Sequence, residues 1–183
     1  MNKAHSLGTS LAIGGALLVL AAGAASIARA EDPSVPASWQ SQKLSFNYLG
    51  ISTTYTCEGL QNSLIFLLQQ SGAKLNHPVY AYPCGIGGAP RQLLSASLDF
   101  STLQAAGDAG AADPASGTWH HVEFSPTHSS PDLRGADCEL VQEFKDTVLP
   151  KFTTRNVKSQ LNCVPYQSTG NLFWLRFDVL APN

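Results

Sequence analysis

The sequence is poor in charged residues and has no surplus of basic ones, which narrows its range of partners. Only 13% of its 183 residues are charged, and 11 Lys and Arg stand against 13 Asp and Glu. A protein that binds DNA or RNA needs a basic face, so this balance argues against nucleic acid as a partner. After residue 30, no apolar run approaches the roughly 20 residues that a membrane-spanning helix requires.

Sequence patterns typical of common active sites are also missing. There is no G-x-S-x-G nucleophile elbow. Gly85, Gly87 and Gly88 lack the spacing and the following helix of a nucleotide-binding loop, so we interpret them as a turn. The sequence contains no C-x-x-C pair, the spacing that is typical of a zinc site. The sequence therefore predicts neither a catalytic centre nor a cofactor.

Residues 1–30 have the pattern of a signal peptide. Lys3 precedes a run of apolar and small residues at 11–25, and the segment Ala28-Arg29-Ala30 matches a cleavage site. We therefore expect cleavage before Glu31 and a periplasmic or secreted protein. A retained membrane anchor is the alternative, but the run is shorter than a spanning helix. The remaining 153 residues, with 9 basic and 13 acidic side chains, suit one domain over 31–183.

Two segments of this domain have helical periodicity. The first opens at Thr56-Cys57-Glu58, where Thr56 suits an N-cap and Glu58 the positive end of the helix dipole. The second opens in the same way at Asp137-Cys138-Glu139, and we expect Gly72 and Pro150 to end the two helices. Apolar residues follow at helical spacing, namely Leu60, Leu64, Leu67 and Leu68 in the first helix and Leu140, Val141, Phe144 and Val148 in the second.

Six further segments alternate between apolar and other residues, as strands do. One strand precedes each helix and two follow it, so a strand-helix-strand-strand unit occurs twice, over about 42–100 and 118–180. The strongest alternation closes each unit. The expected strands are 44–51, 78–83 and 94–100 in the first unit and 118–125, 157–161 and 173–179 in the second.

This pattern predicts the fold class. Alternating strands indicate a sheet with one exposed face, and two helices with single apolar stripes can cover the other face. We therefore predict a two-layer α+β domain, with a mostly antiparallel sheet, two helices on one face and a duplicated unit. We expect residues 31–41 to form a loose N-terminal arm and residues 101–117 a surface connection.

Four cysteines follow the expected cleavage site, an even number that predicts disulfides outside the cytoplasm. They are Cys57, Cys84, Cys138 and Cys163, and four cysteines allow three pairings. In each unit, one cysteine lies in the first turn of the helix and the other at the end of the next strand. We therefore favour pairing within each unit, Cys57 with Cys84 and Cys138 with Cys163.

The segments 55–60, 137–144 and 148–157 resemble a group of small uncharacterised exported proteins of Gram-negative bacteria. The similarity extends over most of the chain after the signal segment. It implies a periplasmic or secreted domain, and it brings no activity and no site residues.

Exposed aromatic residues are the best candidates for a partner surface. Tyr80 and Tyr82 share one face of a short expected strand, and Trp174 points away from its apolar neighbours in the last strand. On the open face of the sheet, Trp174 would suit a protein or ligand. The alternative is that the N-terminal arm or the connection at 101–117 covers it.

Histidines offer a weaker candidate site. His120 and His121 are adjacent in an expected strand, so they point to opposite faces and are poorly placed to bind one metal ion together. A copper or zinc site would need His77 or His128 to join one of them.

Three functions therefore stay open. The first is a non-catalytic periplasmic or secreted interaction domain, whose partner is a protein or another envelope component. The second is a small hydrolase, which would need a pocket that gathers a histidine with a serine or a carboxylate. The third is a periplasmic metal-handling protein.

Overall fold

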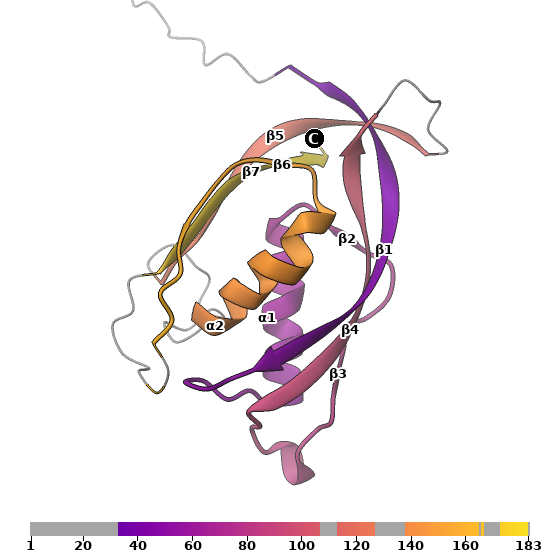
Figure 1. Ribbon diagram of the computed structural model, residues 1–183. Helices are drawn as coiled ribbons and strands as arrows, with labels where there is room; N and C mark the ends of the chain where they lie inside the picture. The colour runs from indigo at the N-terminus through magenta and orange to yellow at the C-terminus, as the bar shows by residue number, and fades with distance from the viewer. Residues whose placement is uncertain (1–32, 107–112, 127–137, 165, 167–172, 183) are drawn as a thin grey trace, which may run out of the picture. The chain divides into compact units, whose positions relative to one another are not determined.

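An antiparallel sheet and two helices make up most of what the structure describes. The computed structural model describes residues 33–106, 113–126, 138–164, 166 and 173–182, so the expected signal segment, Asp137 and His128 lie outside the described residues. The main elements are shown in Figure 1. They are β1 (Val35–Leu49), α1 (Cys57–Gln70), β2 (Lys74–Leu75), β3 (Tyr80–Tyr82), β4 (Leu93–Ala105), β5 (Pro114–Phe124), α2 (Cys138–Glu143), β6 (Thr154–Gln160) and β7 (Trp174–Pro182).

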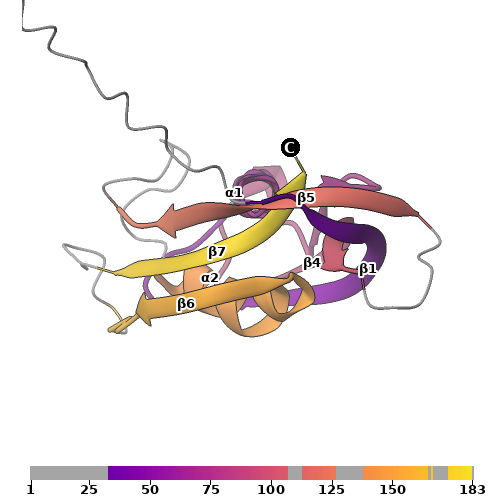
Figure 2. The same cartoon turned by 90° about the horizontal axis from the view of Figure 1, so that it is seen from above.

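The sheet has seven strands and divides into two wings. Its order is β2-β4-β1-β5-β7-β6, and β3 also pairs with β4. β1 pairs with β4 from Ala37 to Leu49, but with β5 only from Val35 to Ser38. Beyond this short contact, β3-β4-β1 forms one wing and β5-β7-β6 the other. Both helices lie on the concave side of the bent sheet, as Figures 1 and 2 show.

The core lies between the helices and this concave face, as the period-two patterns predict. Helix α1 buries the expected stripe, and the alternate residues of β4 and β7 face it from the sheet. Removal of these apolar side chains from water is the main contribution to the stability of such a layer. The fully buried residues include Leu60, Leu64, Leu67 and Leu68 of α1, Ala96 and Phe100 of β4, and Leu175, Phe177 and Val179 of β7.

The ends of α1 follow from local chemistry. The Thr56 hydroxyl accepts a hydrogen bond from the Gly59 amide at 2.9 Å, as expected of an N-cap. At the other end, Gly72 has a φ of +78°, and the amides of Gly72 and Ala73 donate to carbonyls of the last helical turn. Glycine suits this left-handed position best, because a side chain there would be strained and would meet Ala181. The predicted start and end of this helix are confirmed.

The second helix is less regular than expected. After α2 ends at Glu143, the chain continues as a π-helical turn over Phe144–Val148 and a 3₁₀ turn over Leu149–Lys151. Pro150 therefore lies inside the last turn and not beyond the helix. Its ring nitrogen has no hydrogen to donate, so the α-helical bonding pattern cannot continue through it.

The predictions of a loose N-terminal arm over residues 31–41 and of a surface connection over residues 101–117 were wrong in part. Residues 35–41 belong to β1, residues 101–105 to the end of β4, and residues 114–117 to the start of β5. These ends of the strands bury side chains on the opposite face of the sheet, so the alternation that marks the main core is interrupted there. The residues of this second, small cluster are Ala37, Leu103 and Leu180, with Val35, Trp39, Ala115 and Trp119 packed against them.

Candidate functional site

The four cysteines form two disulfides, Cys57–Cys84 and Cys138–Cys163. This is the pairing that the sequence favours. Each bond joins the first residue of a helix to the chain just after a later strand of the same half. This strand is β3 for Cys84 and β6 for Cys163. Because no cysteine is left free, the cysteines have a structural role and supply no thiol for catalysis or metal binding.

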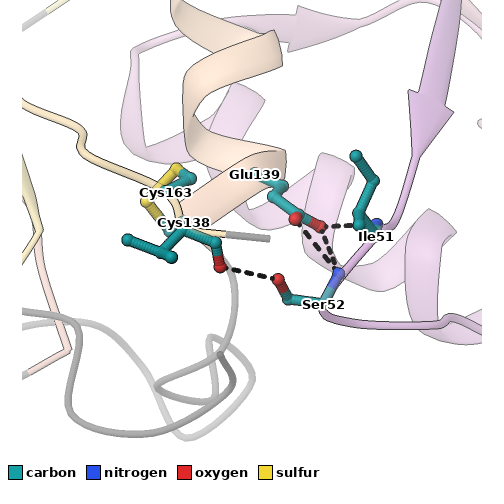
Figure 3. The surroundings of a disulfide bond; sticks show 6 residues. Ile51, Ser52, Cys138, Glu139 and Cys163 are labelled. Carbon is teal, nitrogen blue, oxygen red and sulfur yellow. Dashed lines mark hydrogen bonds between the residues drawn. A yellow bond between two sulfur atoms is a disulfide. The ribbon is translucent and has the colours of Figure 1, made fainter. Parts of the chain in front are cut away.

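Beside the second disulfide, Glu139 makes a contact that its local sequence does not indicate. Its carboxylate accepts hydrogen bonds from the amides of Ile51 at 2.9 Å and Ser52 at 3.1 Å (Figure 3). The Ser52 hydroxyl donates to the Val164 carbonyl, one residue past Cys163, at 3.2 Å. Glu139 thus attaches the β1–α1 connection to the start of α2, in addition to its favourable place at a helix N-terminus.

Next to these residues is a depression of about 240 Å³. Burial, together with the nearby Asp146 carboxylate, raises the pKa of Glu143 on its wall. Glu139, the other acidic residue of the wall, is already bonded to backbone amides. The lining residues are Leu49, Ile51, Glu139, Gln142, Glu143 and Cys163.

An aspartate on the convex face of the sheet organises a polar cluster in the first half of the chain. Asp99 of β4 accepts a hydrogen bond from the Asn76 amide at 3.0 Å, and its other oxygen lies 2.9 Å from His77 Nδ1 and 3.3 Å from Lys43 Nζ. The hydrogen bond from Asn76, followed by those of His77 and Lys43, holds the pKa of Asp99 below its ordinary value. Lys43 lies directly opposite Asp99 in the β1–β4 pair.

A second aspartate has similar surroundings in the other half. Asp178 of β7 lies 2.9 Å from His121 Nδ1, and it accepts hydrogen bonds from Asn156 at 2.7 Å and Arg155 at 3.3 Å. These contacts, with that of His121 the strongest, lower the pKa of Asp178. His121 lies directly opposite Asp178 in the β5–β7 pair. The Arg155 guanidinium also lies over the Trp119 ring, 4.3 Å from its centre.

The histidines are thus held apart by different partners. His120 Nε2 lies 2.9 Å from the Thr118 hydroxyl, while His77 and His121 contact the two aspartates. Within the described ranges, no group of three or more His, Cys, Asp and Glu is placed to hold a metal ion. His77 and His121 are also more than half exposed, and neither lines the depression beside Glu139.

Trp174 lies on the convex face, as its alternation with buried residues predicts, and it is half-buried. Its indole Nε1 donates to the Gln160 side chain at 3.1 Å, and the Arg176 guanidinium lies 5.0 Å from its ring centre. Arg176 in turn pairs with Glu123 at 2.9 Å. Neighbours in the sheet therefore cover part of this residue and bind its polar atom.

Tyr80 and Tyr82 are much more open. Both are exposed, by 60% and 48%, while Ala81 between them is buried. Ser97 and Ser95 of β4 lie directly opposite the two tyrosines, and the next strand, β1, places Ser45 and Asn47 in the same two rows. We call these six residues the tyrosine face: Tyr80, Tyr82, Ser95, Ser97, Ser45 and Asn47.

Exposed aliphatic residues border the tyrosine face at one end. Leu93 and Leu49 form the next cross-strand pair beyond Ser95 and Asn47, and both are about 60% exposed. Ile86, on the turn that follows β3, is 95% exposed. Gly87 and Gly88 in that turn have φ values of +65° and +79°, which explains the glycines and agrees with their interpretation as a turn.

No protein-family model matches this chain, and no curated protein or solved structure is significantly similar to it. Among the residues described, no helix is long and apolar enough to cross a membrane.

Proposed function

We propose that this protein is a non-catalytic binding domain of the periplasm or the extracellular space, and that it binds its partner through the tyrosine face. The observation that carries this proposal is the exposure of large side chains in one place. Tyr80, Tyr82, Leu93 and Leu49 are each about half exposed or more on the same face, with no charged residue between them. Contiguous exposed apolar surface of this kind is typical of interaction sites.

The compartment is supported by the disulfides and by the sequence pattern of residues 1–30. Disulfides form and persist in oxidising surroundings and are rare in the cytoplasm. Both bonds here lie in the part of the chain after the expected cleavage site, and together they use every cysteine.

We also infer that the domain arose by duplication of one strand-helix-strand-strand unit. In both halves the last strand, β4 or β7, pairs with the first strand, β1 or β5, and with a strand that follows the helix, β3 or β6. The aspartate clusters support the equivalence residue by residue. Asp99 lies opposite Lys43 of β1, and Asp178 lies opposite His121 of β5. Each aspartate accepts a hydrogen bond from an asparagine that follows the helix of its half, Asn76 or Asn156.

This equivalence provides an internal comparison for the tyrosine face. Counted from the aspartates, Ser97 corresponds to Arg176, and Ser45 corresponds to Glu123. In the second half these two positions form an ion pair that also contacts Trp174. In the first half they carry only short hydroxyl side chains. The comparison favours the tyrosine face over the Trp174 region as the binding surface.

A photo-crosslinking experiment tests the proposal. A photoreactive phenylalanine analogue is placed at position 80, at 174, or at 166, where Tyr166 is 84% exposed and serves as the control. The protein is then illuminated in its native cell envelope. We expect one defined crosslinked product from position 80. Added wild-type protein without the photoreactive group should reduce the yield of this product by competition, whereas added Tyr80→Thr/Tyr82→Thr protein should not. Threonine retains the preference for a strand.

A product from position 174 alone would show that the tyrosine face is not the binding surface. Equal competition by the wild-type protein and the double variant would have the same meaning. Matching circular dichroism spectra and melting temperatures establish that the variants are folded.

A further inference from the structure

We propose that the ligand of the tyrosine face is an uncharged glycan chain; this inference rests on the proposed function and specifies its partner. The six side chains of the face are two phenols, three aliphatic hydroxyls and one amide. Each of these groups both donates and accepts hydrogen bonds, and none of them belongs to an Asp, Glu, Lys or Arg side chain. Such a surface complements a neutral molecule that is itself rich in hydroxyl groups.

The arrangement of the six residues suits a ring-shaped ligand with one apolar side. Tyr80 and Tyr82 are two positions apart on β3, so their attachment points are about 7 Å apart along the strand. The serines and Asn47 occupy the next two strands, which extend the face sideways by about 10 Å. Large rings therefore stand along one side of a floor of short polar side chains. A sugar can place its C–H side against a tyrosine ring while its hydroxyls bond to the floor.

Part of this floor is already oriented. The Ser95 hydroxyl donates a hydrogen bond to the side-chain amide oxygen Oδ1 of Asn47 at 2.8 Å, which orients the Asn47 side chain. Side chains held in place before binding lose less conformational entropy when the ligand arrives. Leu93 and Leu49 continue the surface at one end and offer further apolar contact.

The composition of the face favours a glycan over a protein partner. The centres of protein interfaces are enriched in aromatic residues, methionine and arginine, and depleted in serine. The tyrosine face has its aromatic residues, but half of its positions are serine and none is methionine or arginine.

The charges around the face also argue against an anionic ligand. The adjoining polar row holds Lys43, Asp99 and His77, and the Lys43 ammonium is paired with the Asp99 carboxylate at 3.3 Å. No lysine or arginine belongs to the face itself. Phosphate-rich or carboxylate-rich polymers would therefore find no cation on the face itself, whereas a neutral chain needs none.

Isothermal titration of the oxidised protein with defined hexasaccharides tests this inference. The neutral probes are the β-1,4- and α-1,4-linked glucose hexamers and the β-1,4-linked N-acetylglucosamine hexamer, and a galacturonic acid hexamer is the anionic probe. We expect at least one neutral hexamer to bind, with an affinity that is unchanged between about 50 and about 500 mM NaCl, because no ion pair contributes.

Variants of the two tyrosines locate the binding. We expect Tyr80→Thr/Tyr82→Thr to weaken it at least about tenfold, since loss of aromatic anchors has effects of this size. The pair Tyr80→Phe/Tyr82→Phe keeps the rings and should keep most of the affinity. Tyr166→Asn removes a tyrosine outside the face that is more exposed than either of the two, and it should change nothing.

Three results would overturn the inference: no binding of any neutral hexamer at about 10 mM, a range that still detects very weak complexes; salt-sensitive binding of the anionic hexamer alone; or equal binding by the threonine variant. These results leave the proposed function testable by itself. A crosslinked protein at position 80 without glycan binding would keep the binding surface and identify its partner as a protein. Failure of both experiments would remove the surface as well.

Discussion

Removal of the second disulfide, by Cys138→Ala/Cys163→Ala, is expected to destabilise the domain strongly without unfolding it. The bond joins residues 25 positions apart. Without it the unfolded chain gains conformational freedom, which in the chain-entropy model corresponds to about 3.5 kcal/mol at 25 °C. Domains of this kind have total stabilities of about 5–15 kcal/mol. The variant should therefore fold, with a clearly lower free energy of unfolding.

The first disulfide is a matched comparison. Cys57 and Cys84 are 27 positions apart, and because the entropy depends on the logarithm of the loop length, the entropic loss should be the same. The two variants differ in packing. Cys138 is 2% exposed and belongs to the core, whereas Cys57 is only partly buried. Loss of the buried sulfur should make the second variant about 1 kcal/mol less stable than Cys57→Ala/Cys84→Ala.

Urea unfolding at pH 7, followed by tryptophan fluorescence, measures both quantities. The midpoint should fall in each variant, and the slope of free energy against urea should rise, because an unfolded chain without the bond exposes more surface. A loss below about 1 kcal/mol with an unchanged slope would refute the reasoning, since the bond would then not act through the unfolded state. A larger loss for the first pair would refute the packing argument.

Three further predictions concern single side chains. Glu139→Gln replaces a charged acceptor of two backbone amides by a neutral one and should cost about 1 kcal/mol in urea unfolding, whereas the same change at Glu58, the matching helix position, should cost less. The pKa of Asp178 is lowered in the folded protein, chiefly by its hydrogen bond with His121. The ionised carboxylate therefore contributes fully to the free energy of unfolding above the unfolded pKa of about 3.9, and this contribution is lost as the pH falls through the lower folded pKa. The melting temperature of Asp178→Asn should thus lie below that of the wild type at pH 7 and approach it below about pH 4; a constant difference would contradict this. Phe124→Ala removes a fully buried ring packed against other phenylalanines and should cost about 3–5 kcal/mol, and a loss below 2 kcal/mol would indicate that the core closes around the space.

Local patterns were sufficient to predict the elements that form the main core. β4 and β7 alternate large apolar residues with polar ones, so both the strands and their buried faces could be predicted. The limits of α1 were predictable for a similar reason, because Thr56 and Gly72 act on backbone groups within a few residues of themselves. The cysteine pairing followed once these elements were placed.

The same patterns did not predict residues 35–43 of β1, which are more than half of the strand. The apolar residues of this stretch, Val35, Ala37 and Trp39, pack on the other face of the sheet, so no alternation toward the main core marks it as a strand. Hydrogen bonds between residues that are distant in the sequence could not be predicted either. Glu139 binds amides that are 87 and 88 positions away, and nothing near it indicates this.

For the candidate site, the sequence alone determined that Tyr80 and Tyr82 share one side of a strand, since neighbours two apart in a strand point the same way. Only the tertiary structure decided that Ser95 and Asn47 continue the row of Tyr82 across three strands, and that Trp174 is partly covered by its neighbours. The physical reason is that the period of a strand is a local property of the backbone. The choice and register of its partner strands depend on how the whole chain buries its apolar surface.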